Sequence, residues 1–277
     1  METKFLTLSD GTIAYDDTGT GPLVVCVPGM GTTRGEFRFF APQLAAAGFH
    51  VATMDLRGHG ESSAGWSDYS VDALGRDVIA LIRALDAGPA LLVGNSVGCA
   101  ASVWAAAEAP EQVSGLLLIA PAVRGETSGV FRLLLSALFI QPWGPAAWVS
   151  YYRSLFKTRK PDDFDRFSAG LGRMLREPGR LAALKRLMFA SQKASAIRLS
   201  RVAAPALALM GSRDPDFKDP EAEARFVAES LHGEYRMIEG AGHYPQTEMP
   251  ELTLPAALSF FETIPSIASR RQAVHAA

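Results

Sequence analysis

The stretch Ala90-Leu91-Leu92-Val93-Gly94-Asn95-Ser96-Val97-Gly98 decides the fold class of this chain. Its first four residues are apolar and predict a buried strand, and the alanine-rich residues after Gly98 predict a helix that runs to about Glu108. Between a strand and a helix, Gly-x-Ser-x-Gly makes a tight turn that exposes the serine hydroxyl above the sheet. A serine so presented becomes a nucleophile when a base removes its proton. The stretch therefore predicts a strand–turn–helix unit with Ser96 as nucleophile; the alternative is a small-residue turn with a bystander serine.

Apolar strands and amphipathic helices alternate on both sides of this stretch. The other strands are expected at residues 5–8, 12–15, 23–27, 50–54, 113–119, 206–210 and 234–238, and the other helices at 37–47, 72–85, 221–231 and 252–261. The first two strands join at Asp10-Gly11, which is a hairpin signal. Repeated strand–helix units predict an α/β fold, in which a mostly parallel eight-stranded sheet carries helices on both faces.

The alternation is interrupted after Pro121. Residues 122–199 contain no convincing strand, and helices are expected there at 131–140, 146–156, 164–175 and 180–190. The strand–helix pattern then resumes. The sequence therefore predicts one α/β core, residues 1–121 and 200–277, with a helical cap of residues 122–199 inserted after the sixth strand. The tail after Ile264 is expected to be mobile.

Composition and charge exclude some classes of protein. A chain of 277 residues that is 48% hydrophobic can bury one large core. With 27 basic and 29 acidic residues, the whole chain is no obvious nucleic-acid binder. The charge is uneven, because residues 122–199 hold 14 Lys and Arg but 5 Asp and Glu, a net charge of +9. This asymmetry fits either a solvated basic insert on an acidic body or a cap that attracts anionic lipid surfaces or substrates.

No segment predicts a membrane span, a cofactor or a metal site. Residues 133–152 carry no charge, but two prolines and a glycine at 142–145 would break a spanning helix. The N-terminus has no apolar signal segment, so a cytoplasmic protein is expected. Cys26 and Cys99 have neither the number nor the spacing of a disulfide framework or a metal site, and buried free thiols are expected.

The general base is expected to be His243. It stands in a glycine-rich loop directly after the predicted strand 234–238, and open α/β sheets place their ligand sites at the carboxyl ends of strands. The acid that orients the base is expected in the loop after strand 206–210, where either Asp214 or Asp216 could serve. Asp214 is preferred because it lies nearer the strand end. The order Ser, Asp, His along the chain is informative, since triads on other folds use other orders.

Two backbone amides are expected to stabilise the negatively charged oxygen of a tetrahedral intermediate. One belongs to Val97, immediately after the proposed nucleophile. The other belongs to Met30 in Pro28-Gly29-Met30-Gly31, the loop after strand 23–27, where flanking glycines leave the amide free to face the serine. The alternative is a plain glycine turn.

With these features the chain resembles the α/β-hydrolase superfamily, in particular its lidded esterase and lipase-like members. The similarity covers about residues 1–121 and 200–263. It includes Ser96 in its pentapeptide, Gly-x-x-Asp ending at Asp214 and Gly-x-Gly-His ending at His243. Residues 55–62 look like the family's turn after the fourth strand, which implies a structural role for His59. Two departures are that many relatives have His-Gly in place of Pro28-Gly29, and that epoxide-opening and dehalogenating relatives carry an aspartate where this chain has serine.

The resemblance implies a carboxylic ester hydrolase that needs no cofactor or metal ion and works through an acyl-enzyme. It also implies that the cap forms a lid over the serine. The residues expected to line the substrate site are Phe131, Leu134, Leu138, Trp143, Trp148 and Tyr244. An apolar lid favours a small-molecule ester with an apolar acyl or alkyl group; in the other interpretation these residues only pack the lid onto the body.

Other activities remain open for the same three residues. The dipeptide Asn95-Ser96 also looks like that of enzymes that hydrolyse carbon–carbon bonds, and a thioesterase or perhydrolase would use the same triad. A different class of function is a ligand-sensing receptor with slow turnover. Weak contact between the basic cap and a lipid surface is a further expectation.

Overall fold

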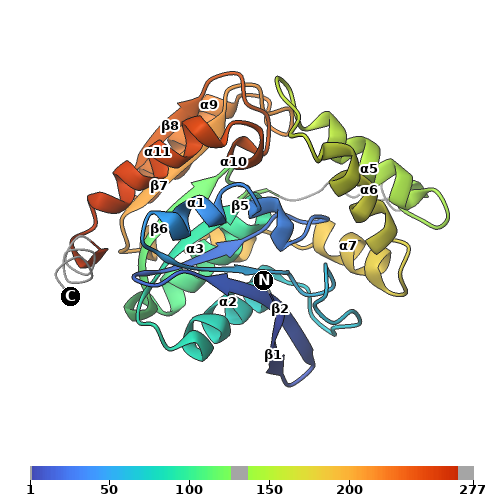
Figure 1. The fold of residues 1–277 in the computed structure, drawn as a ribbon, viewed down its shortest axis with the longest axis horizontal. Coiled ribbons are helices and arrows are strands. Elements are labelled where there is room, and N and C mark those ends of the chain that lie inside the picture. Colours follow the sequence, from blue (N-terminus) through green and yellow to red (C-terminus); the bar gives the residue numbers. More distant parts are fainter. Residues whose placement is uncertain (1, 126–136, 268–277) are drawn as a thin grey trace.

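An eight-stranded sheet forms the centre of the protein (Figure 1). The computed structural model describes residues 2–125 and 137–267. The strands follow the order β1-β2-β4-β3-β5-β6-β7-β8 across the sheet. Their bounds are β1 Lys4–Leu8, β2 Gly11–Thr18, β3 Leu23–Val27, β4 His50–Met54, β5 Ala90–Asn95, β6 Val113–Ile119, β7 Ala206–Gly211 and β8 Glu234–Ile238. Strands β3 to β8 are parallel, and β1 and β2 pair antiparallel, so the predicted mostly parallel sheet of eight strands is confirmed.

Helices cover both faces of this sheet, as expected. Successive residues of a strand point to opposite faces, and β3 accordingly sends Val25 and Val27 into one apolar cluster and Val24 and Cys26 into another. The first cluster includes α2 (Val71–Leu85) and α3 (Val97–Glu108). The second includes α1 (Ala41–Ala46) and α11 (Pro250–Glu262). Both cysteines are buried and free.

The described parts of the chain between β6 and β7 contain helices joined by turns and loops, and no strand. These parts contain α5 (Gly144–Ser154), α6 (Phe164–Met174), α7 (Arg180–Met188), α8 (Lys193–Ala196) and the 3-10 helix η3 (Leu199–Arg201). Helices α5, α6 and α7 lie together to one side of the sheet (Figure 1). Most of the helix expected at 131–140 lies outside the described residues, as does the tail after residue 267. The division into core and cap at residues 121 and 200 stays a prediction.

Several helical segments differ from the expectation. The helix expected at 37–47 is two pieces, the 3-10 helix η1 (Arg34–Phe37) and α1, and α1 has Pro42 in its first turn, where a missing N–H does least harm. The short helices α8, α10 (Pro245–Glu248), η2 (Pro110–Gln112) and η3 were not expected, since three or four residues are too few to show a periodic pattern. The other helices agree with the predictions to within about two residues at each end.

The turn after β4 is held in place by buried contacts. His59 is fully buried, its Nδ1 lies 3.0 Å from the carbonyl oxygen of Arg57, and burial lowers the pKa of its imidazole to about 4. Nearby, the Arg57 guanidinium forms a buried ion pair with Asp77 of α2 at 2.6 Å. These contacts agree with the structural role expected for His59.

No helix in the described parts of the chain combines the length and apolar character that crossing a bilayer requires. The interruption expected near residues 142–145 is present, because α5 begins at Gly144. The cytoplasmic location stays a prediction.

Candidate active site

Ser96 lies in a strained turn between β5 and α3. Its φ of 53° and ψ of −120° fall in a region that costs a non-glycine residue on the order of 1–3 kcal/mol. Such strain persists where surrounding contacts impose it. A Cβ at Gly98 would lie 2.2 Å from the carbonyl oxygen of Val27, and one at Gly94 would lie 2.8 Å from the backbone nitrogen of Cys99. The two glycines expected on either side of Ser96 are therefore required by the close approach of the backbone.

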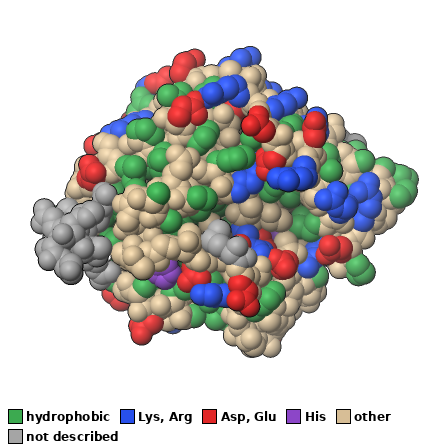
Figure 2. Space-filling model, viewed as in Figure 1, with side chains coloured by type: hydrophobic (Ala, Val, Ile, Leu, Met, Phe, Trp, Pro, Cys, Tyr) green, Lys and Arg blue, Asp and Glu red, His purple; other side chains and the backbone are tan. Residues whose placement is uncertain are grey.

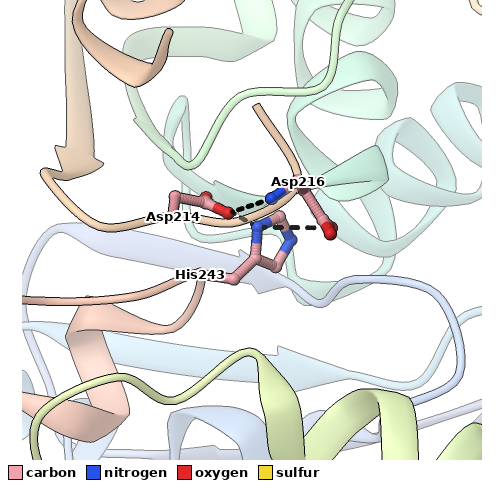
Figure 3. Close-up of side chains that lie close together, drawn as sticks. All are labelled: Asp214, Asp216 and His243. Atoms are coloured by element: carbon pink, nitrogen blue, oxygen red, sulfur yellow. Dashed lines mark hydrogen bonds and ion pairs between the residues drawn. The ribbon is translucent and has the colours of Figure 1, made fainter. Parts of the chain in front are cut away.

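His243 and Asp214 form a buried pair at the ends of neighbouring strands (Figure 3). Asp214 follows β7 and His243 follows β8, and each is 2% exposed. The Nδ1 of His243 lies 2.7 Å from Oδ2 of Asp214 and 3.7 Å from Oδ2 of Asp216. Of the two aspartates considered from sequence, Asp214 thus makes the hydrogen bond to the imidazole.

Asp216 forms its hydrogen bond with α5 instead. This helix belongs to the helical insert, by which we mean the described helices between β6 and β7. Oδ1 of Asp216 accepts a hydrogen bond of 2.6 Å from the hydroxyl of Tyr151 in α5, and the backbone amide of Asp216 donates to Oδ1 of Asp214 at 3.0 Å. Desolvation of the Tyr151 hydroxyl, and then the negative charge of Asp216 beside it, raise the pKa of this hydroxyl well above its ordinary value. Tyr151 was not singled out from the sequence, because nothing local indicates that α5 passes beside residue 216.

The electrostatic surroundings of His243 favour its protonated form. Burial alone would lower the pKa of the imidazole, but the charge and hydrogen bond of Asp214 oppose it, and Asp216 and Glu36 add further negative charge. The net effect raises the pKa of His243 to about 9. The imidazole therefore has a strong affinity for a proton, which is what a base needs.

The loop that carries His243 is held against the turn that carries Ser96. The side-chain amide of Asn95 donates to the carbonyl oxygen of His243 at 3.1 Å, across 148 residues of sequence. The backbone amide of His243 in turn donates to the carbonyl oxygen of Leu155, at the end of α5, at 3.0 Å. The structure thus brings Asn95, His243 and Leu155 together at the carboxyl ends of the strands.

The loop after β3 passes directly beside Ser96. A Cβ at Gly29 would lie 3.0 Å from Oδ1 of Asn95 and 3.3 Å from Cβ of Ser96. In the described part of the chain, the amides of Met30 and Val97 donate no hydrogen bond to another protein group. The loop of Met30 thus lies beside Ser96, and the donor role of both amides stays a prediction.

The residues expected to line the substrate site divide into three groups. Trp148 donates from Nε1 to the carbonyl oxygen of Gly31 at 2.8 Å, and Tyr244 is buried beside His243 with their rings edge to face. Leu138 and Trp143 are instead 46% and 52% exposed. Phe131 and Leu134 lie outside the described residues. Two of the six are thus brought to the loops around Ser96.

Two buried glutamates at this site could not be singled out from the sequence. Glutamate is seldom buried, and nothing in the local pattern marks either position. Glu248 of α10 accepts through Oε1 from the amides of Lys157, Thr158 and Arg159, and through Oε2 from the amide of Gly242. It therefore fastens the segment after α5 to the loop of His243. The other glutamate, Glu36, lies beside Gly29.

Asp214, Asp216 and His243 also form the one group among the described residues whose geometry could hold a metal ion. One donor atom from each lies within 4.8 Å of the others. A cation there would use the Nδ1 of His243 and so replace its hydrogen bond to Asp214.

Comparisons with known proteins agree with this geometry. The model of a family described as alpha/beta hydrolase fold matches residues 22–250. "Putative non-heme bromoperoxidase BpoC" of Mycobacterium tuberculosis is 31% identical over 262 residues, which cover 91% of this chain and 98% of the relative. The 3-oxoadipate enol-lactonase 2 of Acinetobacter baylyi is 27% identical over 73% of this chain and 75% of its own length.

A solved structure shows the same arrangement. The crystal structure of a hydrolase from Pseudomonas aeruginosa PA01 superposes with a TM-score of 0.81 at 25% identity, covering 93% of this chain and 97% of that chain. The family match agrees with the eight-stranded sheet and with a site at the carboxyl ends of the strands. The chain therefore belongs to the α/β-hydrolase family and is an enzyme of the hydrolase type.

Proposed function

We propose that this enzyme hydrolyses carboxylic esters through an acyl-enzyme on Ser96, with His243 as general base and Asp214 as the orienting acid. The observation that carries the proposal is the buried contact of 2.7 Å between His243 and Asp214. The loop of His243 is in turn held against the turn of Ser96 by the hydrogen bond from Asn95. The name of the Acinetobacter relative, an enol-lactonase, supports it as well, since a lactone is a cyclic ester.

The proposed reaction proceeds in two halves. Oγ of Ser96 attacks the ester carbonyl while Nε2 of His243 takes its proton, and the tetrahedral intermediate collapses as His243 protonates the departing alcohol. His243 then deprotonates a water molecule, which attacks the acyl-enzyme, and the second tetrahedral intermediate releases the acid as His243 returns the proton to Oγ of Ser96. Asp214 keeps the Nδ1–H of the imidazole directed at itself, which leaves Nε2 free for the reaction.

The amides of Val97 and Met30 are the proposed donors to the oxyanion. Removing one such donor typically lowers kcat by about 10²- to 10³-fold. Neither amide has an acceptor among residues 2–125 and 137–267, and the loop of Met30 lies against the turn of Ser96. The side chain of Met30 packs against Trp148 and its neighbours in the helical insert, which holds the loop in place.

We further propose that residues 122–199 form a cap that binds an apolar acyl or alkyl group. Trp148 and Tyr244 are the described candidates for contact with it. On the face in Figure 2, Lys and Arg side chains gather where α5 to α7 lie, and the exposed Leu138 and Trp143 belong to the same segment. This combination supports weak contact with an anionic lipid surface.

The experiment compares aryl esters of one acid that differ only in their leaving group, with added methanol as a competing acceptor. An acyl-enzyme intermediate predicts one ratio of methyl ester to free acid for every leaving group, and no turnover by Ser96→Ala. A ratio that changes with the leaving group, or activity in Ser96→Ala, would contradict the proposal. A series of acyl chain lengths on the same enzyme tests the cap, for which the fastest turnover is expected above acetyl.

A second candidate is suggested by the relative named as a bromoperoxidase. Hydrogen peroxide could replace water in the second half, so that the acyl-enzyme yields a peracid and free Ser96. Adding peroxide to the ester assay and measuring peracid tests this directly. Peracid formed faster than free acid at millimolar peroxide would favour the second candidate.

A further inference from the structure

Glu36 is a buried carboxyl group that the proposed mechanism does not use. It lies in η1 and is 1% exposed. Its Oε2 accepts from the backbone amide of Gly29 at 3.1 Å, and its Oε1 accepts from Nε2 of Gln246 at 2.8 Å. Its own carbonyl oxygen accepts from the hydroxyl of Thr247 at 2.8 Å. Every one of these contacts is buried.

The partners of Glu36 belong to the two loops that the proposed reaction has to align. Gly29 immediately precedes Met30, whose amide is the proposed oxyanion donor. Gln246 and Thr247 lie in α10, three and four residues after His243. One side chain thus connects the oxyanion loop to the segment that follows the base, across 210 residues of sequence.

Burying a carboxyl group at position 36 destabilises the fold unless its hydrogen bonds compensate. Burying a charge without compensation costs several kcal/mol, and removing one partner from a buried charged contact leaves the other partner's polar atoms unpaired, which is strongly destabilising. Burial raises the pKa of Glu36 to about 8, whereas the amide of Gly29, the charge of His243 and the amide of Gln246 favour its charged form. The hydrogen bonds, rather than packing, are therefore the feature that an apolar residue could not replace.

We propose that Glu36 is a positioning residue that fixes the oxyanion loop relative to the base, so that the Met30 amide and His243 reach the same substrate carbonyl. The proposal rests on the proposed function. It concerns alignment in the transition state, so kcat is expected to depend on Glu36 while KM does not.

Two substitutions separate alignment from charge. Glu36→Met keeps a similar volume but removes both acceptors, and kcat is expected to fall about 10- to 100-fold with KM within about twofold. Glu36→Gln is expected to recover most of the activity. Its oxygen can still accept from Gly29, and its nitrogen can donate to Gln246 once that amide turns over, since Oε1 of Gln246 has no partner among the described residues.

The control is Asp77→Asn, which alters another buried carboxyl far from these loops in sequence, on α2. It is expected to lower the melting temperature without changing kcat per active site. Active sites are counted by fluorophosphonate labelling, which also separates the two proposals. If the wild type neither hydrolyses esters nor labels at Ser96, the proposed function fails; if the wild type is active and Glu36→Met has the same kcat, only the role of Glu36 fails.

A second variant keeps the test decisive if Glu36→Met does not fold. Gln246→Met removes one of the two side-chain contacts and leaves the Gly29 contact in place. A fall in kcat of about 3- to 10-fold with unchanged KM is expected. An unchanged kcat, or a rise in KM alone, would overturn the inference.

Discussion

At the scale of single residues, local motifs and distant contacts contribute differently to the site. Ser96 and His243 stand in short glycine-bounded motifs that sequence alone brings to attention. Asp214 and Asp216 are two positions apart in one loop, so the sequence does not distinguish which of them binds the imidazole. The distances from Nδ1 of His243 do so, at 2.7 Å for Asp214 and 3.7 Å for Asp216. Glu36 had no local signal because its partner Gln246 is 210 residues away. The catalytic roles themselves stay predictions.

The two aspartates are expected to differ sharply when mutated. Asp214→Asn removes the carboxylate that holds the imidazole, and kcat on an ester is expected to fall by roughly 10³- to 10⁴-fold. Asp216→Asn is expected to lower kcat by less than about 10-fold, because the Asp216 carboxylate accepts its hydrogen bond from Tyr151 and not from His243. Steady-state kinetics of both variants measure the difference. Loss of turnover in Asp216→Asn alone would show that the acid is misassigned.

The raised pKa of His243 predicts an alkaline enzyme. The imidazole must be neutral to accept a proton, and its pKa is raised to about 9, so kcat/KM is expected to rise with pH up to about that value. In Asp214→Asn the main cause of the raised pKa is gone, so the residual activity should reach its plateau at lower pH. A pH profile of kcat/KM for both enzymes tests this. A wild-type plateau already complete at pH 6 would be inconsistent with the buried ion pair.

At the scale of elements, apolar runs bounded by turn residues were the most predictable feature. Strands β3, β4, β6 and β8 have the bounds expected from sequence. Strand β2 continues three residues further, to Thr18, because its polar end pairs with β4 and its Asp17 binds Lys4 at 2.7 Å. Polar residues in a strand near the sheet edge give no apolar signal, so the extension is visible only in the structure.

Gly98, in the turn after Ser96, is expected to tolerate alanine less well than the partly exposed Gly170. Gly98→Ala would bring a methyl group to 2.2 Å from the backbone of Val27 and is expected to destabilise the fold by about 1–3 kcal/mol. Gly170 lies in α6, where an added Cβ would meet only the side chain of Arg173, at an ordinary contact distance of 3.7 Å, and Gly170→Ala is expected to stabilise by roughly 0.5–1 kcal/mol. Urea unfolding of both variants measures the contrast. Equal effects would mean that the close approach at Gly98 is absent.

Glu248 is expected to hold the segment after α5 in place. Both of its oxygens accept only from backbone amides, so Glu248→Gln must leave a donor facing a donor. The expected cost is about 1–3 kcal/mol, with faster hydrogen exchange at the amides of residues 157–159 or 242. Glu251→Gln in the neighbouring helix α11, where an exposed pair with Arg159 is lost, is the control and should change stability by less than about 1 kcal/mol. Unchanged exchange in Glu248→Gln would refute this anchoring.

At the scale of the whole molecule, the helical insert and the core share a boundary made of the loops around Ser96. Met30 packs into the cluster of Trp148, and Tyr244 packs into that of Tyr152 and Phe156. Arg38 of the core forms an ion pair with Asp163 of the insert at 2.7 Å. The eight-stranded sheet and the presence of helices between β6 and β7 were predictable from the alternation of elements. These contacts were not, because they join residues that lie far apart in the sequence.

The central claim is that Ser96 is made nucleophilic by the His243–Asp214 pair. The most direct measurement is labelling with a fluorophosphonate followed by peptide mass spectrometry, on the wild type, Ser96→Ala and His243→Ala. We predict one label per chain, on Ser96, with none on Ser96→Ala and a rate reduced by at least about 100-fold in His243→Ala. Equally fast labelling of His243→Ala, or a label on another residue of the wild type, would contradict the account.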